Sequence, residues 1–336
     1  MKVVRLHGAR DVRLTDEPVP VPGPGEALVR VTAVGICGSD LHWFAESAIG
    51  GVGLTQPLVL GHEAAGVIAS GPRTGERVAI DPSVPCERCA TCARGLGHLC
   101  PNVRVLGYGT TDGAMREFLA WPEAQLVALP DTIDDVGGAM LEPLGVAVHA
   151  LRLARLGPGD SIGVFGAGPI GLLLIQLALA SGATTVVATD RLTHRVAAAR
   201  ALGAVAELVT DGSERAALLE ATGGEGVDTA IEIAGEDDAI GAAIELVKPA
   251  GIVVVAGIPE GHTVTITGAS ARRKGLDLRF ARRMNRVYST AIELVTRGRV
   301  DLDAVVGDRF ALADAPVALA SASRREGHKV VLLPGG

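Results

Sequence analysis

Four of the chain's five cysteines lie in one proline-flanked loop with the spacing C-x2-C-x2-C-x7-C. They are Cys86, Cys89, Cys92 and Cys100. Four thiolates this close can converge on one tetrahedral ion, and they leave no open position for chemistry. A disulfide pair and an iron–sulfur cluster are alternatives, but nothing indicates an oxidising compartment, and ferredoxin runs have three residues before their last cysteine. The spacing therefore predicts a structural zinc site.

A second set of residues has the chemistry of a catalytic metal site but is scattered along the chain. Cys37 lies in the motif G-I-C-G-S-D-L-H, His62 and Glu63 lie in G-H-E-A-A-G, and Glu142 lies in L-E-P-L. Cysteine, histidine and carboxylate are the donors of catalytic zinc, where three protein ligands leave a fourth place for water or substrate. Sequence spacing alone does not show that these residues meet, so ordinary packing and hydrogen-bonding roles stay open.

A third motif is the glycine-rich G-A-G-P-I-G at residues 166–171. It follows an apolar stretch and opens a predicted helix, which is the context of a dinucleotide site. Gly166 permits a tight turn, Gly168 lets the backbone approach a pyrophosphate, and Gly171 lets the helix pack closely on the strand. Asp190, about twenty residues beyond Gly168, is placed to accept hydrogen bonds from ribose hydroxyls. This favours NAD over NADP, although Arg191 and Arg195 nearby leave dual use open and Asp190 has an ordinary strand-terminal alternative.

The elements that must position these residues show two different secondary-structure patterns. The first 145 residues form short strands and loops, with strands expected at 27–34, 58–60, 66–69 and 77–80. A helix expected at 144–156 is followed by strands at 161–165, 185–189, 227–233 and 252–256 and by helices at 170–181, 194–202 and 237–247. Alternating strands and helices predict a doubly wound parallel sheet, and therefore an α/β chain. A helix at 289–296 and a strand at 329–333 close it, which suggests domains at 1–145, 146–280 and 281–336.

The composition narrows the class of partner. Of the 336 residues, 48% are hydrophobic and 21% are charged, and the formal charge is −7 without a long Lys or Arg run, so nucleic acid is not an expected partner. The uncharged stretch between Asp160 and Asp190 is long enough for a membrane span, but its glycines and Pro169 favour a buried strand–turn–helix–strand. The N-terminus contains no apolar core of signal-peptide length. We expect a cytoplasmic protein with no membrane partner.

Together, these motifs and L-E-P-L-x-V-x-x-H-A resemble the zinc-containing medium-chain dehydrogenases, within them the polyol (sorbitol, xylitol and L-idonate) dehydrogenase group. The resemblance runs nearly end to end. It implies a GroES-like, mostly β catalytic domain, completed by the C-terminal segment, around a Rossmann coenzyme domain. It also implies two zinc ions per subunit, one catalytic and one structural, with NAD as coenzyme.

The resemblance assigns roles residue by residue. Cys37, His62 and Glu63 would hold the catalytic zinc. Glu142 falls at a third-ligand position, where it would touch the metal through water or exchange with Glu63. Ser39 and His42 match a proton relay. At the coenzyme, the matching contact positions are Ile170, Asp190, Arg195, Ala256, Gly257 and Ile258.

Two departures concern the substrate. Polyol dehydrogenases commonly have a tyrosine where this chain has Trp43, and a Phe-Arg-Tyr where it has Ala281-Arg282-Arg283. The expected reaction is oxidation of a secondary hydroxyl of a polyol or sugar derivative, with Trp43, Glu142 and Arg282 at the substrate. L-Threonine 3-dehydrogenase and a simple secondary-alcohol dehydrogenase are the alternatives, and a non-catalytic NAD-binding protein is a further one. The family also implies a homodimer or homotetramer.

Overall fold

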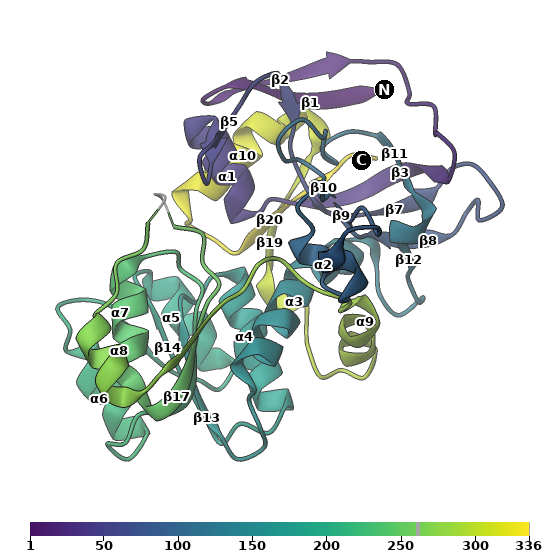
Figure 1. Ribbon diagram of the computed structural model, residues 1–336. Helices are drawn as coiled ribbons and strands as arrows, with labels where there is room; N and C mark the ends of the chain where they lie inside the picture. The colour runs from purple at the N-terminus through teal and green to yellow at the C-terminus, as the bar shows by residue number, and fades with distance from the viewer. Residues whose placement is uncertain (260–262, 336) are drawn as a thin grey trace. The chain divides into compact units, whose positions relative to one another are not determined.

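The computed structural model describes residues 1–259 and 263–335. The chain divides into two compact units. Unit 1 comprises Met1–Pro143, Tyr288–Thr296 and Leu302–Gly336, and unit 2 comprises Leu144–Val287 and Arg297–Asp301. The chain therefore starts in unit 1, forms unit 2, and returns to unit 1 for its last segment (Figure 1).

Unit 1 is built mainly from short strands. They are β1 (Lys2–Gly8), β2 (Asp11–Asp16), β3 (Glu26–Gly35), β4 (Ala48–Ile49), β5 (Val52–Gly53), β6 (Leu58–Val59), β7 (Glu63–Ile68), β8 (Arg77–Ile80), β9 (Ser83–Val84), β10 (Arg104–Val105), β11 (Phe118–Pro122), β12 (Leu126–Ala128), β19 (Val306–Ala311) and β20 (Lys329–Leu333). The largest sheet has the order β12-β8-β7-β3-β20-β19, and β11 also pairs with β3. Its helices are α1 (Gly38–Glu46), α2 (Ala90–Ala93), α9 (Tyr288–Thr296) and α10 (Ala315–Arg324).

The register of the largest sheet brings together segments that lie far apart in sequence. Antiparallel pairing of β3 with β7 sets Gly35 opposite Glu63, and pairing of β20 with β3 sets Val331 opposite Gly35. The residues just beyond the end of β3, just before β7 and at the start of β20 therefore meet at one place. Cys37, His62 and Lys329 occupy these three positions.

Unit 2 contains a parallel sheet. Its strands are β13 (Ser161–Phe165), β14 (Thr185–Asp190), β15 (Val205–Leu208), β16 (Val227–Glu232), β17 (Val247–Val255) and β18 (Asp277–Phe280). They have the order β15-β14-β13-β16-β17-β18, and every pairing is parallel. In chain order this is 3-2-1-4-5-6, the arrangement of a dinucleotide-binding sheet, so the predicted doubly wound fold is confirmed. Its helices are α4 (Pro169–Ala180), α5 (Thr193–Ala201), α6 (Glu214–Ala221), α7 (Asp237–Leu246) and α8 (Gly268–Lys274).

The uncharged stretch that raised the membrane alternative folds as β13, α4 and β14. Helix α4 is apolar on all sides, and Leu172, Leu173 and Leu174 have no exposed surface, which is the pattern of a helix buried in a core. Its one polar interior side chain, Gln176, exchanges two hydrogen bonds with the backbone of Asp301, at 3.0 and 2.7 Å. Within residues 1–259 and 263–335, none of the helices combines the length and apolar character that a membrane span requires.

Helix α3 (Asp135–Ala154) begins nine residues before the expected start at 144. Asp134 caps it, because its carboxylate accepts a hydrogen bond from the Gly137 backbone N–H at 2.7 Å. The expected start at 144 is wrong. The helix continues through Pro143, although proline is a residue type that usually breaks a helix. Glu142 is therefore held on a regular helix rather than on a loop.

Candidate active site

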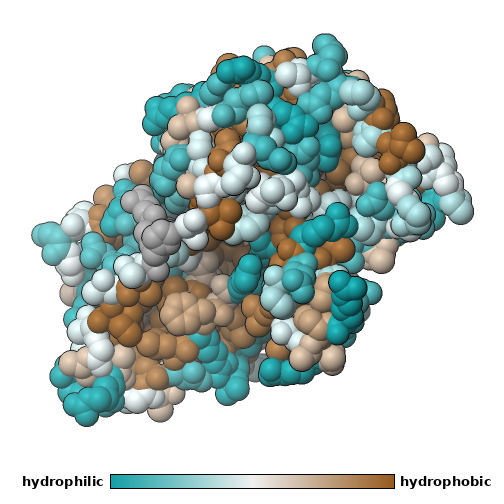
Figure 2. Space-filling view, turned by 45° about the horizontal axis from the view of Figure 1, so that its top comes forward, coloured by the Kyte–Doolittle hydropathy of each residue, from teal (hydrophilic) through white to brown (hydrophobic). Residues whose placement is uncertain are grey.

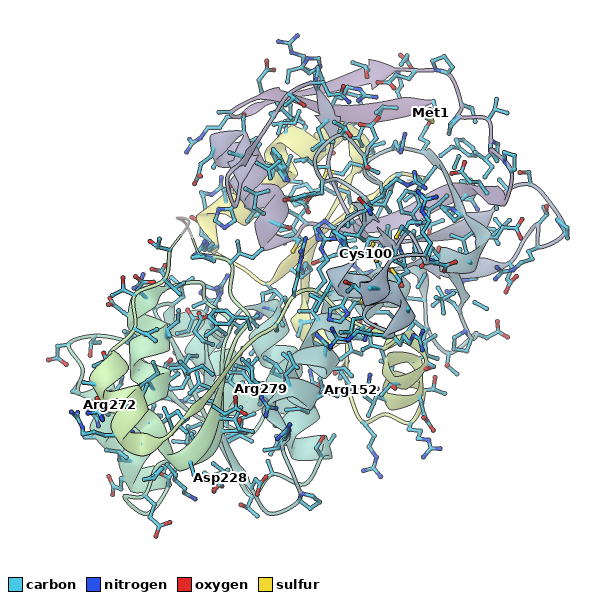
Figure 3. The ribbon with its side chains drawn as sticks, viewed as in Figure 1. Met1, Cys100, Arg152, Asp228, Arg272 and Arg279 are labelled. Atoms are coloured by element: carbon cyan, nitrogen blue, oxygen red, sulfur yellow. The ribbon has the colours of Figure 1, made fainter. Side chains whose placement is uncertain are left out.

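The four clustered cysteines meet as the spacing predicts. Their sulfur atoms all lie within 4.8 Å of one another, with 3.5 Å between those of Cys89 and Cys92 and 3.9 Å between those of Cys89 and Cys100. Four sulfurs around one zinc ion stand about 3.8 Å apart, given a Zn–S distance of about 2.3 Å. All four are free thiols, which excludes the disulfide alternative in this structure. Figure 3 shows sulfur atoms grouped at Cys100, beside α2.

The surroundings of these thiols lower the pKa of some and raise that of another. Backbone N–H groups of Cys86, Cys92 and Asn102 donate hydrogen bonds to cysteine sulfurs at 3.4–3.5 Å. The Arg88 N–H lowers the pKa of Cys86 to about 6, whereas desolvation raises the pKa of Cys92 to about 12. Neighbouring thiolates repel one another, so a full set of four needs a cation among them. The donor set fits a closed zinc site.

The scattered set also meets, although its members lie far apart in sequence. One ligand atom each from Cys37, His62 and Glu63 lies within 4.8 Å of the others. Glu63 is fully buried, whereas Cys37 and His62 are partly exposed, so the group has an open side. Gly35 makes room for it, because a Cβ there would lie 2.2 Å from Glu63 Oε2. Cysteine, histidine and carboxylate with an open side are the donor set and shape of a catalytic zinc site.

Lys329 is the residue of this site that sequence reasoning missed. Its Nζ lies 2.7 and 2.8 Å from the two carboxylate oxygens of Glu63 and donates a third hydrogen bond to the Ile36 carbonyl at 3.1 Å. Both residues are buried, with Lys329 4% and Glu63 0% exposed. Burial lowers the pKa of Lys329, but the charge of Glu63 outweighs it and the net shift is upward. The available signal was a lysine at the start of the otherwise apolar strand β20.

Asp40 is a second missed residue, although it lies inside the G-S-D motif. Its buried carboxylate accepts hydrogen bonds from the N–H groups of Cys37 at 2.9 Å and Gly61 at 3.0 Å, and Oδ1 lies 3.7 Å from His62 Nδ1. Asp40 therefore fixes the backbone on both sides of the ligand group and orients the imidazole. Burial lowers the pKa of His62, but the charges of Asp40 and Cys37 more than offset this and raise it.

The expected proton-relay residues lie on α1, directly after Cys37. Ser39 Oγ lies 3.5 Å from His62 Nε2. His42, one helical turn later, has Nδ1 4.0 Å from Glu46 Oε1 and is partly exposed. The Ser39 hydroxyl thus lies beside the ligand group, and both Ser39 and His42 are partly exposed, so their relay role stays a prediction.

Glu142 is not part of the group of three ligand atoms, but it lies within their electrostatic influence. It is 6% exposed, and burial raises its pKa to about 7, with Glu63 adding to the rise and His62 and Lys329 opposing it. Burial raises the pKa of Tyr288, and the charges of Asp81, Glu142 and Glu63 add to the rise. The Tyr288 hydroxyl donates a hydrogen bond to the Ile80 carbonyl at 3.1 Å. Sequence reasoning did not single out Tyr288.

The two residues expected at the substrate, Trp43 and Arg282, differ in burial. Trp43 is 1% exposed, belongs to the apolar core of unit 1, and meets Tyr108 edge to face with ring centroids 6.1 Å apart. Arg282 is exposed in unit 2, in the segment after β18. The structure therefore shows Trp43 as a core residue and leaves its expected substrate role a prediction, as it does for Arg282.

The glycine motif forms the turn from β13 into α4. Gly166 has φ +110°, and a Cβ there would lie 2.9 Å from the Ala234 nitrogen. Gly171 lies against the same turn, because its Cβ would be 1.9 Å from the Gly166 carbonyl oxygen. Gly168 is the N-cap of α4 and makes no side-chain cap hydrogen bond, which leaves the helix N-terminus suited to a phosphate. The guanidinium of Arg195 lies beside it, because a Cβ at Gly168 would be 3.4 Å from Arg195 Nη1.

Asp190, at the end of β14, faces this turn. Its Oδ2 accepts a hydrogen bond from the Ala167 N–H at 2.8 Å, and its Oδ1 accepts one from the Leu192 N–H at 2.9 Å. Arg195 Nη1 lies 3.7 Å from Asp190 Oδ2. After β17, the turn Ala256–Ile258 is tied to β16, since the N–H groups of Ala256 and Gly257 donate to the Glu232 carbonyl. The cradle fits a dinucleotide, with Ile170 on the first turn of α4.

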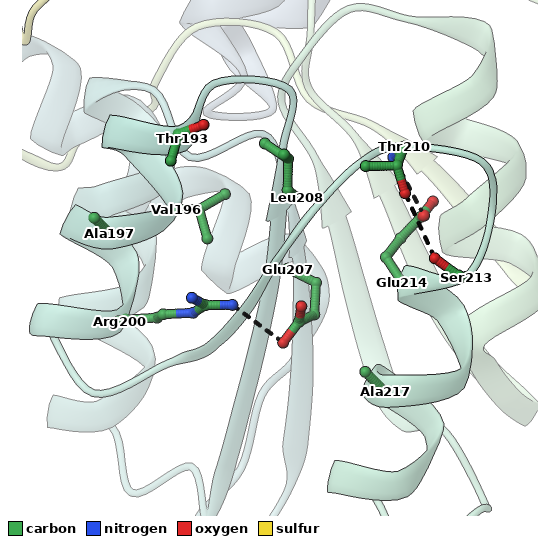
Figure 4. Close-up of a pocket in the computed structure, with 10 residues that line it drawn as sticks. All are labelled: Thr193, Val196, Ala197, Arg200, Glu207, Leu208, Thr210, Ser213, Glu214 and Ala217. Carbon is green, nitrogen blue, oxygen red and sulfur yellow. Dashed lines mark hydrogen bonds and ion pairs between the residues drawn. The ribbon is translucent and has the colours of Figure 1, made fainter.

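A separate pocket of about 540 Å³ lies elsewhere on unit 2, between α5 and the segment leading into α6 (Figure 4). The pair Arg200–Glu207, 3.3 Å apart, and the residues Thr210, Ser213 and Glu214 line it. Glu214 already accepts the N–H groups of Thr210 and Gly212. None of the predicted site residues lines this pocket.

Comparison with known proteins gives a family match in each of the two units. Residues 23–131 match the alcohol dehydrogenase GroES-like domain, and residues 169–297 match the zinc-binding dehydrogenase domain. Sorbitol dehydrogenase of Bacillus subtilis (strain 168) is 33% identical over 99% of this chain and 97% of its own length. Sorbitol dehydrogenase of Gallus gallus is 35% identical over 98% of this chain and 95% of its own length.

Solved structures show the same relationship. A protein from Sinorhizobium meliloti 1021, described as a zinc-binding dehydrogenase and bound to NADP, is 31% identical, with a TM-score of 0.89 over 99% of both chains. The predicted GroES-like domain with a Rossmann domain is thereby confirmed, as is a zinc and nicotinamide-coenzyme chemistry. This chain belongs to the zinc-containing medium-chain dehydrogenases, in their polyol dehydrogenase group.

Proposed function

We propose that this enzyme oxidises a secondary hydroxyl of a polyol or sugar derivative to a ketone, reducing NAD to NADH and releasing a proton. The observation that carries the proposal is the convergence of Cys37, His62 and Glu63 within 4.8 Å, with the Ser39 hydroxyl 3.5 Å from the imidazole of His62. The small-molecule class follows from the relatives, which are sorbitol dehydrogenases.

The chemistry divides between the bound groups and the chain. When bound, zinc would supply Lewis-acid polarisation of the alcohol oxygen, and the nicotinamide would supply the hydride acceptor. Ser39 accepts the hydroxyl proton of the substrate, and His42 passes it toward solvent, as general acid–base catalysis requires. Asp40 holds His62 in orientation, and Lys329 holds Glu63. Glu142, whose pKa burial raises to about 7, would contact the metal through water or exchange with Glu63 at the third ligand position.

Two zinc ions per subunit are proposed because the two donor sets differ in kind. Cys86, Cys89, Cys92 and Cys100 form a closed set of four, which fits a structural ion. Cys37, His62 and Glu63 form a set of three with an open side, which fits a catalytic ion. Zinc analysis of the purified protein should give two ions per chain.

NAD is the proposed coenzyme because Asp190 is an acidic, nearly buried residue at the ribose position of the fold. Gly166, Gly168, Ile170 and Gly171 would surround the pyrophosphate. Arg195 and the turn Ala256–Ile258 would contribute further contacts. Trp43 and Arg282 are proposed at the substrate. Trp43 stands where polyol dehydrogenases commonly have a tyrosine, and Arg282 corresponds to the arginine of their Phe-Arg-Tyr.

A homodimer or homotetramer is proposed from an unpaired sheet edge. In the described part of the chain, β18 pairs only with β17, and Phe280 at its end is 68% exposed. Such an edge is a template for pairing with another chain. Figure 2 shows apolar side chains gathered on the lower half of the visible face. Ile258 and Ile266 of unit 2 are also exposed.

The test is NADH formation by zinc-loaded protein with sorbitol, xylitol, other polyols, L-threonine and simple secondary alcohols, each with and without a chelator. Chelator-sensitive turnover of a polyol is the expected result. Turnover of threonine or a simple alcohol alone would keep the zinc mechanism and overturn the polyol assignment. A chain that holds no zinc at the Cys37 site and turns over nothing would instead be a non-catalytic NAD-binding protein.

A further inference from the structure

An ion pair reaches across the end of the parallel sheet beside the glycine turn. Arg191 directly follows Asp190 at the end of β14, and its Nη1 lies 3.2 Å from Glu236 Oε1, after β16. Its Nη2 lies 3.9 Å from Asp238 Oδ2, in the first turn of α7. Because β13 lies between β14 and β16, the pair spans the strand whose end carries the glycine turn.

The Glu236 side chain contacts Arg191 and does not cap its own helix, α7. It is the N-cap residue of α7, yet its side chain makes no capping hydrogen bond. The loop that carries it borders the coenzyme cradle, since Ala234 packs against Gly166 closely enough to exclude a Cβ there. Glu236 therefore holds the guanidinium of Arg191 at the edge of the proposed adenosine site.

An arginine next to the ribose carboxylate is the residue type that accepts a 2′-phosphate in this fold. A phosphate monoester carries a charge of about −1.5 to −2 near pH 7. Arg191 is 54% exposed, so its pairing with one carboxylate near a second neutralises it in part, and the two carboxylates repel the incoming phosphate. The same pair leaves the uncharged 2′-hydroxyl of NAD unaffected.

We infer that Glu236, assisted by Asp238, sets the preference for NAD over NADP by holding Arg191 away from the 2′ position. The inference deepens the proposed coenzyme preference and rests on the proposed function. Glu236 is the stronger determinant, because it is 34% exposed and 3.2 Å from Arg191. Asp238 is 94% exposed and 3.9 Å away, so solvent and salt screen it more.

The experiment measures NADH and NADPH dissociation constants of zinc-loaded protein by coenzyme fluorescence, supported by kcat/KM with NAD and NADP. The variants are Glu236→Gln, Asp238→Asn and the double variant. Asp237→Asn is the matched control: it removes the same charge from the same exposed helical turn, and Asp237 has no ion pair in the described part of the chain. The three variants are repeated in an Arg191→Ala background.

We expect the double variant to improve NADPH binding relative to NADH by about tenfold, the size of one charge-assisted contact. Most of the gain should appear with Glu236→Gln alone, and little with Asp237→Asn. The gain should disappear in the Arg191→Ala background. An unchanged ratio, or a gain that survives without Arg191, would overturn the inference while NADH binding stays intact. A wild-type protein that binds neither coenzyme would overturn the proposed function itself.

Discussion

Replacing Lys329 by methionine tests the buried ion pair of the candidate active site. The change removes three Nζ hydrogen bonds of 2.7–3.1 Å and leaves Glu63, which is 0% exposed, without its counter-charge. Breaking a buried pair from one side costs about 3–5 kcal/mol. For a unit of this size that loss lowers the melting temperature by roughly 10 °C.

The assay is thermal unfolding of wild-type and Lys329→Met protein, each metal-free and zinc-loaded. The loss should be largest without metal, because a zinc ion bound to Glu63 would itself neutralise the carboxylate. The double variant Glu63→Gln, Lys329→Met should recover most of the metal-free loss, since it leaves no unpaired charge. A metal-free loss below about 1 kcal/mol, the level of an exposed pair, or a double variant no more stable than the single one, would refute the reasoning.

Three further predictions follow from the same contacts. Burial raises the pKa of Glu142 from 4.5 to about 7, so metal-free protein should lose stability as the pH rises through this range; Glu142→Gln should therefore melt higher than wild type at pH 8 but not at pH 4.5, and a pH-independent difference would contradict this. Cys92→Ala should lose one of two zinc ions per subunit by elemental analysis and melt at a lower temperature, whereas retention of both ions would show that the loop is not a zinc site. Phe280→Glu should shift the mass measured by light scattering toward the monomer, and an unchanged mass would place the subunit contact elsewhere.

The parallel sheet was predictable because its central strands are buried on both faces. Strands β13 and β14 are therefore mostly apolar, and the predicted limits at 161–165 and 185–189 agree with Ser161–Phe165 and Thr185–Asp190 to within one residue. The edge strands were missed. β15 is half exposed and contains Glu207, and β18 contains Asp277 and Arg279, so neither has an apolar run. These edge strands form because they pair with a neighbouring strand. The pattern of their own residues contains no information about that neighbour.

The candidate site also has residues that were predictable from the sequence and residues that were not. The four-cysteine cluster was predictable from spacing, because its members lie within one loop. Cys37, His62 and Glu63 were identified through family motifs, and only the register of β3 with β7 explains why they meet. Lys329 is separated from Glu63 by 266 residues, and it reaches the site only because β20 inserts beside β3. No local signal states which strand a C-terminal lysine will join.

The charges of the site argue that it is built for a dication. Asp40 and Glu63 are fully buried carboxylates, and Glu142 is a third, with the Cys37 sulfur beside them. Lys329 supplies one positive charge, and His62 supplies another only when protonated. Buried anions in excess of cations are costly, and the negative charge of Glu63 adds to the burial that raises the pKa of Glu142 to about 7. A bound divalent ion would remove the excess and allow Glu142 to ionise, so metal binding and ionisation of Glu142 should be linked. If the two glutamates share one ligand position as proposed, Lys329 would stabilise Glu63 while Glu142 binds the metal, and Glu142 would take up a proton while Glu63 binds it.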